Sequence, residues 1–78
     1  MLFTVYSKDG CPYCTKVKTV LELTGKQFVA YELGRDFTKE EFYSEFGNGS
    51  TFPQVICDDK KLGGSVETIK FLKENQII

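Results

Sequence analysis

The stretch that decides the fold reads YSKDGCPYC at residues 6–14. It joins a strand-like run to a helix start through a short polar loop that leads to two closely spaced cysteines. The preceding run, Leu2–Ser7, is rich in β-branched and aromatic residues and predicts a strand. Its apolar residues occupy both odd and even positions, which suits a central strand covered on both faces. Pro12 predicts the start of a helix, because its missing N–H has no intrahelical partner at the first helical position.

The end of this helix and the strands of the chain also have boundaries in the sequence. Gly25 predicts the helix end, since a residue in the left-handed conformation often follows the last turn. Three further runs are predicted to be strands: Gln27–Leu33, Gln54–Cys57 and Lys60–Leu62. A right-handed crossover makes the first two strands parallel, and the short turn at residues 58–59 makes the last two antiparallel.

The second helix has two independent start signals. Thr38 and Glu41 have the spacing of a capping box. Phe37 and Phe42 have the spacing of a hydrophobic staple around the same start. The segment at residues 47–50, which reads GNGS, ends this helix.

A third helix is predicted after the last strand. Ser65 is expected to cap it, and its apolar side is expected to carry Val66, Ile69 and Leu72. The element order is then β-α-β-α-β-β-α. This order predicts an α/β fold, a four-stranded mixed sheet with helices on both faces.

Composition limits the size and the class of the protein. Seventy-eight residues, 41% of them hydrophobic, make a single domain over residues 1–78. Ten basic residues nearly cancel eleven acidic ones, which argues against binding to nucleic acid or a membrane surface. The N-terminus resembles a strand and not a secretion signal, and three cysteines make a poor disulfide framework. We therefore expect a cytoplasmic location and a monomer.

The tetrapeptide CPYC at residues 11–14 carries the predicted chemistry. Cys11 falls at the start of the first helix, where unpaired N–H groups and the helix dipole favour an anion. Such a placement lowers a thiol pKa from about 8.5 to roughly 3.5–7.5, and Lys8 can add positive charge. Cys14 lies one turn later on the apolar stripe with Leu21, so it is expected to face inward. The pattern predicts disulfide exchange in which Cys11 attacks as a thiolate and Cys14 resolves the mixed disulfide.

The competing interpretation of the tetrapeptide is half of a zinc site. A tetrahedral zinc site usually needs four protein ligands. Cys57 could be a third ligand, but the chain has three cysteines and no histidine. We therefore predict that no metal binds within one chain. Cys57 itself lies in a predicted strand and is expected to behave as a small buried hydrophobe without a catalytic role.

Thr51-Phe52-Pro53 is a second candidate element, directly before the third strand. A proline there can simply begin a strand, because it need not donate a ladder hydrogen bond. The functional interpretation is a cis peptide bond at Pro53 beside the thiols. Such a bond would present the backbone N–H and C=O of Phe52 to an extended peptide or a peptide-like thiol.

The third candidate element is the segment GGSVE at residues 63–67. A turn followed by a helix start explains its composition. The functional interpretation adds an anion site, because the N–H groups of Ser65 and Val66 would be free at the helix start. Such a site could bind a substrate carboxylate.

With these three elements in order, the chain resembles the glutaredoxin family of the dithiol type over nearly its whole length. The tetrapeptide at residues 11–14 matches the family's active site, and Gly63-Gly64 matches its double glycine. Thr51-Phe52-Pro53 matches its Thr-Val-Pro segment, with Phe52 in place of valine. The resemblance implies a thioredoxin fold and a glutathione-disulfide oxidoreductase that acts on protein disulfides and glutathione mixed disulfides. It also implies glutathione as co-substrate, with no permanently bound cofactor.

The resemblance further implies a glutathione groove beside the cysteines. The residues that it assigns to this groove are Lys8, Tyr13, Thr51, Phe52, Pro53, Gly64, Ser65 and Val66. The backbone of Phe52 would hold the cysteinyl part of glutathione, and Ser65 and Val66 would meet the γ-glutamyl carboxylate. Lys8 would bind the glycine carboxylate. Arg35 is the candidate for a second residue, near the second helix, that supports binding of this carboxylate. Ser65 departs from the cysteine, tyrosine or phenylalanine that often follows the double glycine.

Two alternatives remain open from the sequence. The protein could be reduced by thioredoxin reductase in place of glutathione, as some glutaredoxin-like electron donors for ribonucleotide reductase are. It could instead carry an iron–sulfur cluster between two chains, with glutathione as co-ligand. By analogy with the family, Pro12 favours an enzyme over such a cluster carrier. The expected partners are glutathione and protein disulfides, with ribonucleotide reductase as a candidate substrate from the family alone.

Overall fold

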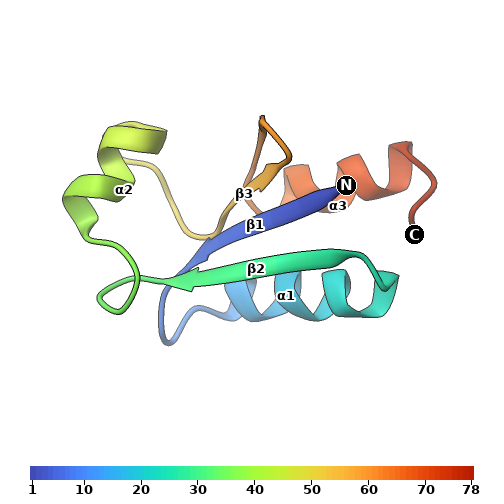
Figure 1. The fold of residues 1–78 in the computed structure, drawn as a ribbon, viewed down its shortest axis with the longest axis horizontal. Coiled ribbons are helices and arrows are strands. Elements are labelled where there is room, and N and C mark those ends of the chain that lie inside the picture. Colours follow the sequence, from blue (N-terminus) through green and yellow to red (C-terminus); the bar gives the residue numbers. More distant parts are fainter.

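The computed structural model describes all residues 1–78, and its elements follow the predicted order (Figure 1). They are β1 (Leu2–Ser7), α1 (Pro12–Thr24), β2 (Gln27–Glu32), α2 (Lys39–Phe46), β3 (Gln54–Cys57), β4 (Lys60–Gly63) and α3 (Ser65–Glu74). Two strands differ from the prediction by one residue, because β2 ends at Glu32 and β4 continues to Gly63. Leu33 lies outside β2, where its N–H donates a hydrogen bond to the Ser7 C=O at 2.9 Å and it forms an isolated bridge with Phe37.

The strands form one mixed sheet in the order β2-β1-β3-β4. β1 pairs in parallel with β2, where Val5 lies opposite Ala30. It pairs antiparallel with β3, where Val5 lies opposite Val55, and β3 continues antiparallel into β4. The predicted parallel crossover and the predicted final hairpin are both confirmed. β1 is therefore an interior strand, and its C-terminal end leads into the loop before Cys11.

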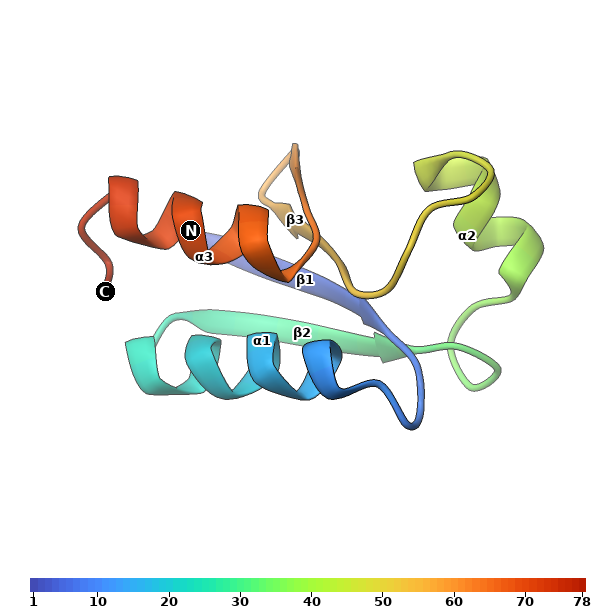
Figure 2. The same ribbon diagram turned by 180° about the vertical axis from the view of Figure 1, so that it is seen from behind.

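α1 and α3 lie side by side on one face of the sheet (Figure 2). Alternate residues of β1 point toward these helices, and Phe3 and Val5 are completely buried there. The main core consists of Phe3, Val5, Val17, Leu21, Val55, Cys57 and Leu72. Burial of apolar surface is the largest favourable contribution to folding, at about 25 cal/mol per Å². This layer therefore fixes α1 against the sheet, and with it the tetrapeptide at residues 11–14.

α2 lies over one end of the opposite face, near the C-terminal end of β1 (Figure 1). An aromatic cluster holds it there, made of Tyr6, Phe37, Phe42, Phe46 and Phe52. The ring of Tyr6 on β1 lies 5.2 Å from that of Phe37 and 5.0 Å from that of Phe46. Farther along this face, Val29 and Tyr31 are 40% and 39% exposed. Helices therefore cover one face of the sheet and only one end of the other.

Both predicted start signals of α2 are present in the structure. The Thr38 hydroxyl accepts a hydrogen bond from the Glu41 N–H at 3.1 Å, and the Glu41 carboxylate accepts one from the Thr38 N–H at 2.9 Å. The rings of Phe37 and Phe42 stack with their centres 5.8 Å apart. Gly25 likewise ends α1 with a φ of 72°, as predicted. These local signals were sufficient because they act within a few residues of the helix ends.

The third helix differs from the prediction at its start and on its buried side. Its N-cap residue is Gly64, and Ser65 is the first helical residue. Thr68 and Leu72 are buried, whereas Val66 is 71% exposed. Residues four apart share one helix face, and Val66 lies about 200° around the helix from Thr68. Leu72 and Thr68 therefore define the core side, and the predicted apolar side was wrong at Val66.

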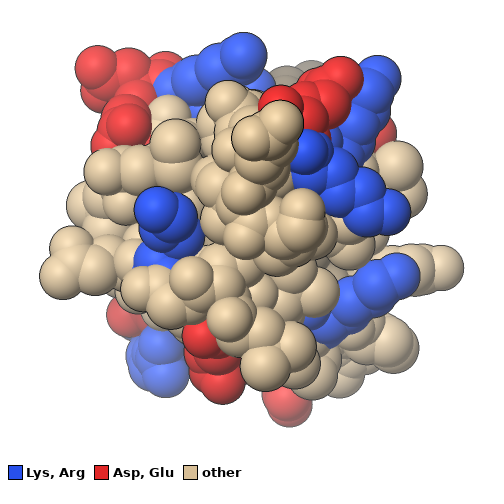
Figure 3. All heavy atoms as spheres, turned by 90° about the vertical axis from the view of Figure 1, so that its right-hand side faces the viewer, with Lys and Arg blue, Asp and Glu red and all other residues tan.

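Basic and acidic side chains are present in nearly equal numbers, ten against eleven. On the face that carries the two chain termini, basic and acidic side chains lie interspersed among other residues (Figure 3). None of the three helices has both the length and the apolar character that crossing a bilayer requires.

Candidate active site

Cys11 and Cys14 lie where the loop after β1 leads into α1. A disulfide joins them, with their Cα atoms 5.2 Å apart, inside the usual range of about 4.4–6.8 Å. Cys11 is the N-cap residue of α1, and its sulfur accepts a hydrogen bond from the Cys14 N–H at 3.2 Å. Cys14 is 1% exposed, whereas Cys11 is only partly buried. The predicted asymmetry between an accessible and a shielded cysteine is present.

The start of α1 favours negative charge on the Cys11 sulfur. The N–H groups of the first turn have no intrahelical acceptors, and the helix dipole adds partial positive charge there. No acidic residue occupies this turn. The hollow beside Cys11 is lined by Lys8 and Lys18 but also by Asp9 and Glu32, so its side-chain charges balance. The backbone of α1 is therefore the most direct stabiliser of a thiolate at this position.

Phe52 presents free backbone polar groups. The Phe52–Pro53 peptide bond is cis, as predicted. Neither the N–H nor the C=O of Phe52 takes part in a backbone hydrogen bond. Pro53 is buried, and Phe52 is partly buried. These two groups are therefore available to pair with an extended peptide.

A pocket of about 480 Å³ brings the predicted elements together. It is lined by Tyr13, Thr51, Phe52, Pro53, Gly64, Ser65, Val66 and Glu67. Every residue predicted for the groove except Lys8 lines this pocket, and Lys8 lies in a neighbouring hollow with Thr51 and Phe52. The size falls within the range of small-ligand sites, roughly 300–1,000 Å³. Tyr13 is 62% exposed and forms an open wall.

The double glycine permits close contacts that a side chain would prevent. Gly63 has a φ of +111°, and a Cβ at this residue would lie 3.0 Å from Glu67 Cγ. The Glu67 carboxylate accepts a hydrogen bond from the Gly64 N–H at 2.9 Å. No backbone hydrogen bond reaches the N–H groups of Ser65 or Val66. These two N–H groups are thus free at the start of α3, in the arrangement expected of a carboxylate site.

The ring of Phe52 belongs to the aromatic cluster. It stacks on Phe42 with ring centres 4.1 Å apart and planes inclined by 11°. The Lys8 ammonium lies 5.3 Å from the centre of the same ring. Phe42 is 1% exposed and fixed on α2. α2 therefore helps to position Phe52 and its free backbone groups.

Lys39, the first residue of α2, is a binding candidate that the sequence analysis missed. It lines the hollow that also contains Lys8 and Phe52. Arg35, the candidate from the sequence, is paired instead with Asp36, with 2.8 Å between guanidinium nitrogen and carboxylate oxygen. This hydrogen bond lowers the pKa of Asp36. The capping box locates the first turn of α2, but nothing in the sequence shows that this turn lies beside Lys8.

Cys57 does not join the active-site pair. It is a free, buried cysteine of β3. Burial raises the pKa of its thiol, and the charge of Asp58 adds to the shift. This agrees with its predicted role as a small core residue. No group of three or more His, Cys, Asp or Glu side chains is placed to hold a metal ion.

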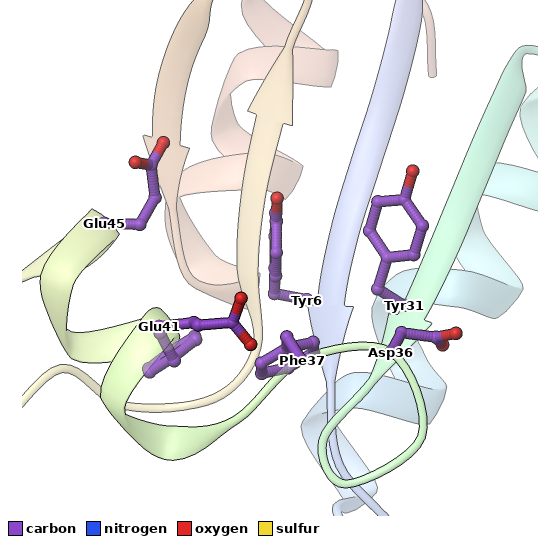
Figure 4. Close-up of a pocket in the computed structure, with 7 residues that line it drawn as sticks. Tyr6, Tyr31, Asp36, Phe37, Glu41 and Glu45 are labelled. Carbon is purple, nitrogen blue, oxygen red and sulfur yellow. The ribbon is translucent and has the colours of Figure 1, made fainter.

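A separate hollow lies on the α2 side of the sheet (Figure 4). Its lining residues are Tyr6, Tyr31, Asp36, Phe37, Glu41, Phe42 and Glu45. The rings of Tyr6 and Tyr31 stand side by side there, 5.6 Å apart. Burial, and then the negative charge of Glu45, raise the pKa of Tyr6. Glu41 is held by the capping box, and Glu45 lies 3.9 Å from the Lys61 ammonium. No cysteine lines this hollow, so the redox site is the one around residues 11–14.

Comparison with known proteins agrees with this geometry. Residues 3–62 match the family profile described as Glutaredoxin. Glutaredoxin-C6 of Oryza sativa subsp. japonica is 34% identical over 77 residues, which cover 95% of this chain and 69% of that protein. The structure of reduced Escherichia coli glutaredoxin aligns with a TM-score of 0.83 at 25% identity, over 100% of both chains. The buckwheat glutaredoxin–glutathione complex shares the fold, with a TM-score of 0.74 at 24% identity over 96% of this chain and 71% of that one.

These likenesses confirm the thioredoxin fold that the sequence resemblance implied. They also agree with the chemistry of the site, in which an accessible cysteine at a helix start is bonded to a shielded partner one turn later. The chain therefore belongs to the glutaredoxin family of thiol–disulfide oxidoreductases.

Proposed function

We propose that this protein uses glutathione to reduce protein disulfides and mixed disulfides between proteins and glutathione. The observation that carries the proposal is the pocket in which Tyr13, the free backbone of Phe52 and the start of α3 meet. These groups suit a tripeptide thiol, because they offer an apolar wall, a backbone partner and a positively polarised helix end. Buckwheat glutaredoxin, which shares the fold, forms a complex with glutathione.

Each part of glutathione has a proposed partner in this pocket. The N–H and C=O of Phe52 pair with the cysteinyl residue, which directs its sulfur toward Cys11. The N–H groups of Ser65 and Val66 receive the γ-glutamyl carboxylate. Lys8 and Lys39, which line the adjoining hollow, attract the glycine carboxylate.

Reduction of a glutathione mixed disulfide needs only Cys11. Its thiolate attacks the glutathione sulfur, the S–S bond breaks, and the protein thiolate leaves and takes a proton from water. The new Cys11–glutathione disulfide is then attacked by the thiolate of a second glutathione. This step releases glutathione disulfide and restores the Cys11 thiolate. The net reaction therefore consumes one reduced glutathione, which leaves bonded to the glutathione that came from the substrate.

Reduction of a protein disulfide needs Cys14 as well. Cys11 attacks one sulfur of the substrate and releases the other as a thiolate. Cys14 then loses its proton and attacks the Cys11 sulfur, which frees the second substrate thiol. The product is the Cys11–Cys14 disulfide found in the structure. Two glutathione molecules return it to the dithiol.

The setting of this activity is also a proposal. Glutathione-coupled reduction fits a cytoplasmic monomer, because the glutathione pool of that compartment is reducing. Ribonucleotide reductase is the protein substrate that the family resemblance suggests. Purified subunits of that enzyme, oxidised at their active site, would test the suggestion directly.

The central experiment compares three cysteine variants in two coupled assays. Cys11→Ser should abolish reduction of both protein disulfides and glutathione mixed disulfides. Cys14→Ser should keep the second activity and lose the first. Cys57→Ser is the matched control and should keep both. Loss of both activities in Cys14→Ser would contradict the proposed division of roles.

The reductant is tested in the same assays. Glutathione with glutathione reductase and NADPH should sustain turnover, whereas thioredoxin reductase with NADPH should not. The opposite result would mean that thioredoxin reductase, and not glutathione, reduces this protein. Lys39→Glu should raise the KM for glutathione several-fold with little change in kcat, because a charge that attracts a carboxylate becomes one that repels it.

A further inference from the structure

A second groove runs between α1 and α3 and carries an excess of positive charge. Its lining residues are Lys16 of α1 and Val66, Ile69, Lys70, Lys73 and Glu74 of α3. We call these residues the basic groove. Three ammonium groups face one carboxylate here, although the whole chain has a net charge of −1.

The lysines of the basic groove have no partner within the chain. The ion pairs of the protein involve Arg35 and Lys61. The lysines that lie over aromatic rings are Lys8, Lys60 and Lys61. Lys16, Lys70 and Lys73 are in neither group, and all three are exposed. Their charges are therefore free to attract carboxylates of another molecule.

The basic groove is continuous with the proposed glutathione pocket. Val66 lines both, and Tyr13, which lies between the two cysteines in the chain, lines the pocket. Val66 is 71% exposed and forms an apolar rim between the two depressions, and Tyr13 is 62% exposed in the wall of the pocket. A peptide whose cysteine has reached Cys11 can therefore extend across this rim and into the groove.

The hollow that contains Tyr6 and Tyr31, on the opposite face of the sheet, has the opposite charge. The hollow beside α2 is lined by three carboxylates, those of Asp36, Glu41 and Glu45, and by no basic residue. An acidic segment is therefore attracted to the basic groove and repelled from this hollow. This asymmetry can orient a substrate before the sulfur atoms meet.

We propose that the basic groove docks an acidic segment of the protein substrate, next to the cysteine that is reduced. Carboxylates of the segment pair with Lys16, Lys70 and Lys73, and an apolar side chain covers Val66 and Ile69. This inference rests on the proposed function for its catalytic readout. Glutathione itself does not need the groove, so the groove selects among protein substrates and leaves the chemistry unchanged.

The test uses two synthetic peptides, each with one central cysteine carrying glutathione. In one peptide the flanking residues are aspartate, glutamate and a leucine; in the other, lysine replaces each acidic residue. Wild-type protein should reduce the acidic peptide with the higher kcat/KM. The preference should shrink as ionic strength rises, because salt screens exposed charges over about 10 Å at 0.1 M.

Charge-reversal variants locate the effect. Lys70→Glu and Lys73→Glu should each lower kcat/KM for the acidic peptide about threefold, and the double variant about tenfold. Lys26→Glu is the matched control, since Lys26 is exposed and lines none of these depressions. It should leave kcat/KM unchanged. All variants should reduce a small glutathione mixed disulfide, such as that of cysteamine, at the wild-type rate.

Binding is measured separately with a peptide in which serine replaces the cysteine. Its addition should shift the backbone amide signals of the basic groove in NMR spectra of wild-type protein, and the double variant should show no such shifts. If these shifts occur but the small mixed disulfide is not reduced, the docking site stands and the proposed function fails. If the small disulfide is reduced but the double variant treats the acidic peptide as wild type does, the docking proposal is wrong.

Discussion

Replacing Phe52 by valine should lower the free energy of unfolding by about 2–3.5 kcal/mol. The stack on Phe42, with ring centres 4.1 Å apart, contributes about 0.5–1.5 kcal/mol beyond its buried area. The Lys8 ammonium over the same ring contributes about 0.5–1 kcal/mol. The smaller apolar surface of valine removes about 1 kcal/mol more. Urea unfolding followed by far-UV circular dichroism, with a reductant present to keep the cysteines in one state, measures the sum.

A double-mutant cycle isolates the ring stack from the other contributions. Phe52→Val combined with Phe42→Leu should show a coupling energy of about 1 kcal/mol. Phe28→Val is the matched control, because Phe28 is partly buried against the main core. Its effect should add to that of Phe42→Leu within about 0.5 kcal/mol. Equal coupling for Phe28 and Phe52, or a loss below about 0.5 kcal/mol for Phe52→Val, would refute the reasoning.

Three further substitutions test other features of the structure. Gly63→Ala should lower the free energy of unfolding by about 1–3 kcal/mol, because alanine is strained at a φ of +111° and its Cβ would contact Glu67. Gly10→Ala is the control and should cost less, because a Cβ at Gly10 has open space. Equal losses of stability for the two variants would contradict the contact with Glu67. Thr68→Val should raise the free energy of unfolding by about 1 kcal/mol, because the buried Thr68 hydroxyl has no hydrogen-bond partner. A lower melting temperature of the variant in thermal melts would show that the hydroxyl does have a partner. Tyr6 keeps its proton to higher pH in the folded state than in the unfolded chain, since its pKa is raised mainly by burial. The stability that this proton contributes is therefore complete below about pH 10 and declines as pH rises through the folded pKa. Tyr6→Phe should reduce the fall in the free energy of unfolding between pH 9 and 11, measured by urea titrations at intervals of about half a pH unit. An unchanged dependence of stability on pH would contradict this.

Helix ends and strand boundaries that depend on signals within a few residues were predicted well. The proline at the start of α1, the glycine at its end and the capping box of α2 all lie where the sequence placed them. Each depends on backbone groups within one helical turn. The strand boundaries were right to within one residue, because turns and glycines interrupt the chain at short intervals.

The active-site elements were also predictable, since each has a local chemical signature. Cys11 and Cys14 are close because a separation of three residues within one helical turn makes them so. The free N–H groups of Ser65 and Val66 follow from the helix start. Glutathione binding by these groups stays a proposal until the variants are measured.

Positions that depend on packing between distant segments were missed. Val66 was placed in the core, yet Leu72 and Thr68 define the buried side of α3. Lys39 was missed, because only the packing of α2 brings it beside Lys8. Arg35 was named for the carboxylate, but its guanidinium pairs with Asp36. None of these results follows from spacing alone.

The sequence by itself determined the order of the elements, the pair of reactive cysteines and the helix starts that surround them, because these features depend on neighbours along the chain. Only the tertiary structure decided that Phe52 rests on α2, that Lys39 lies beside Lys8, and that unpaired lysines of α1 and α3 line one groove. Those contacts join residues far apart in the chain, and which side chains meet there depends on how whole helices settle on the sheet.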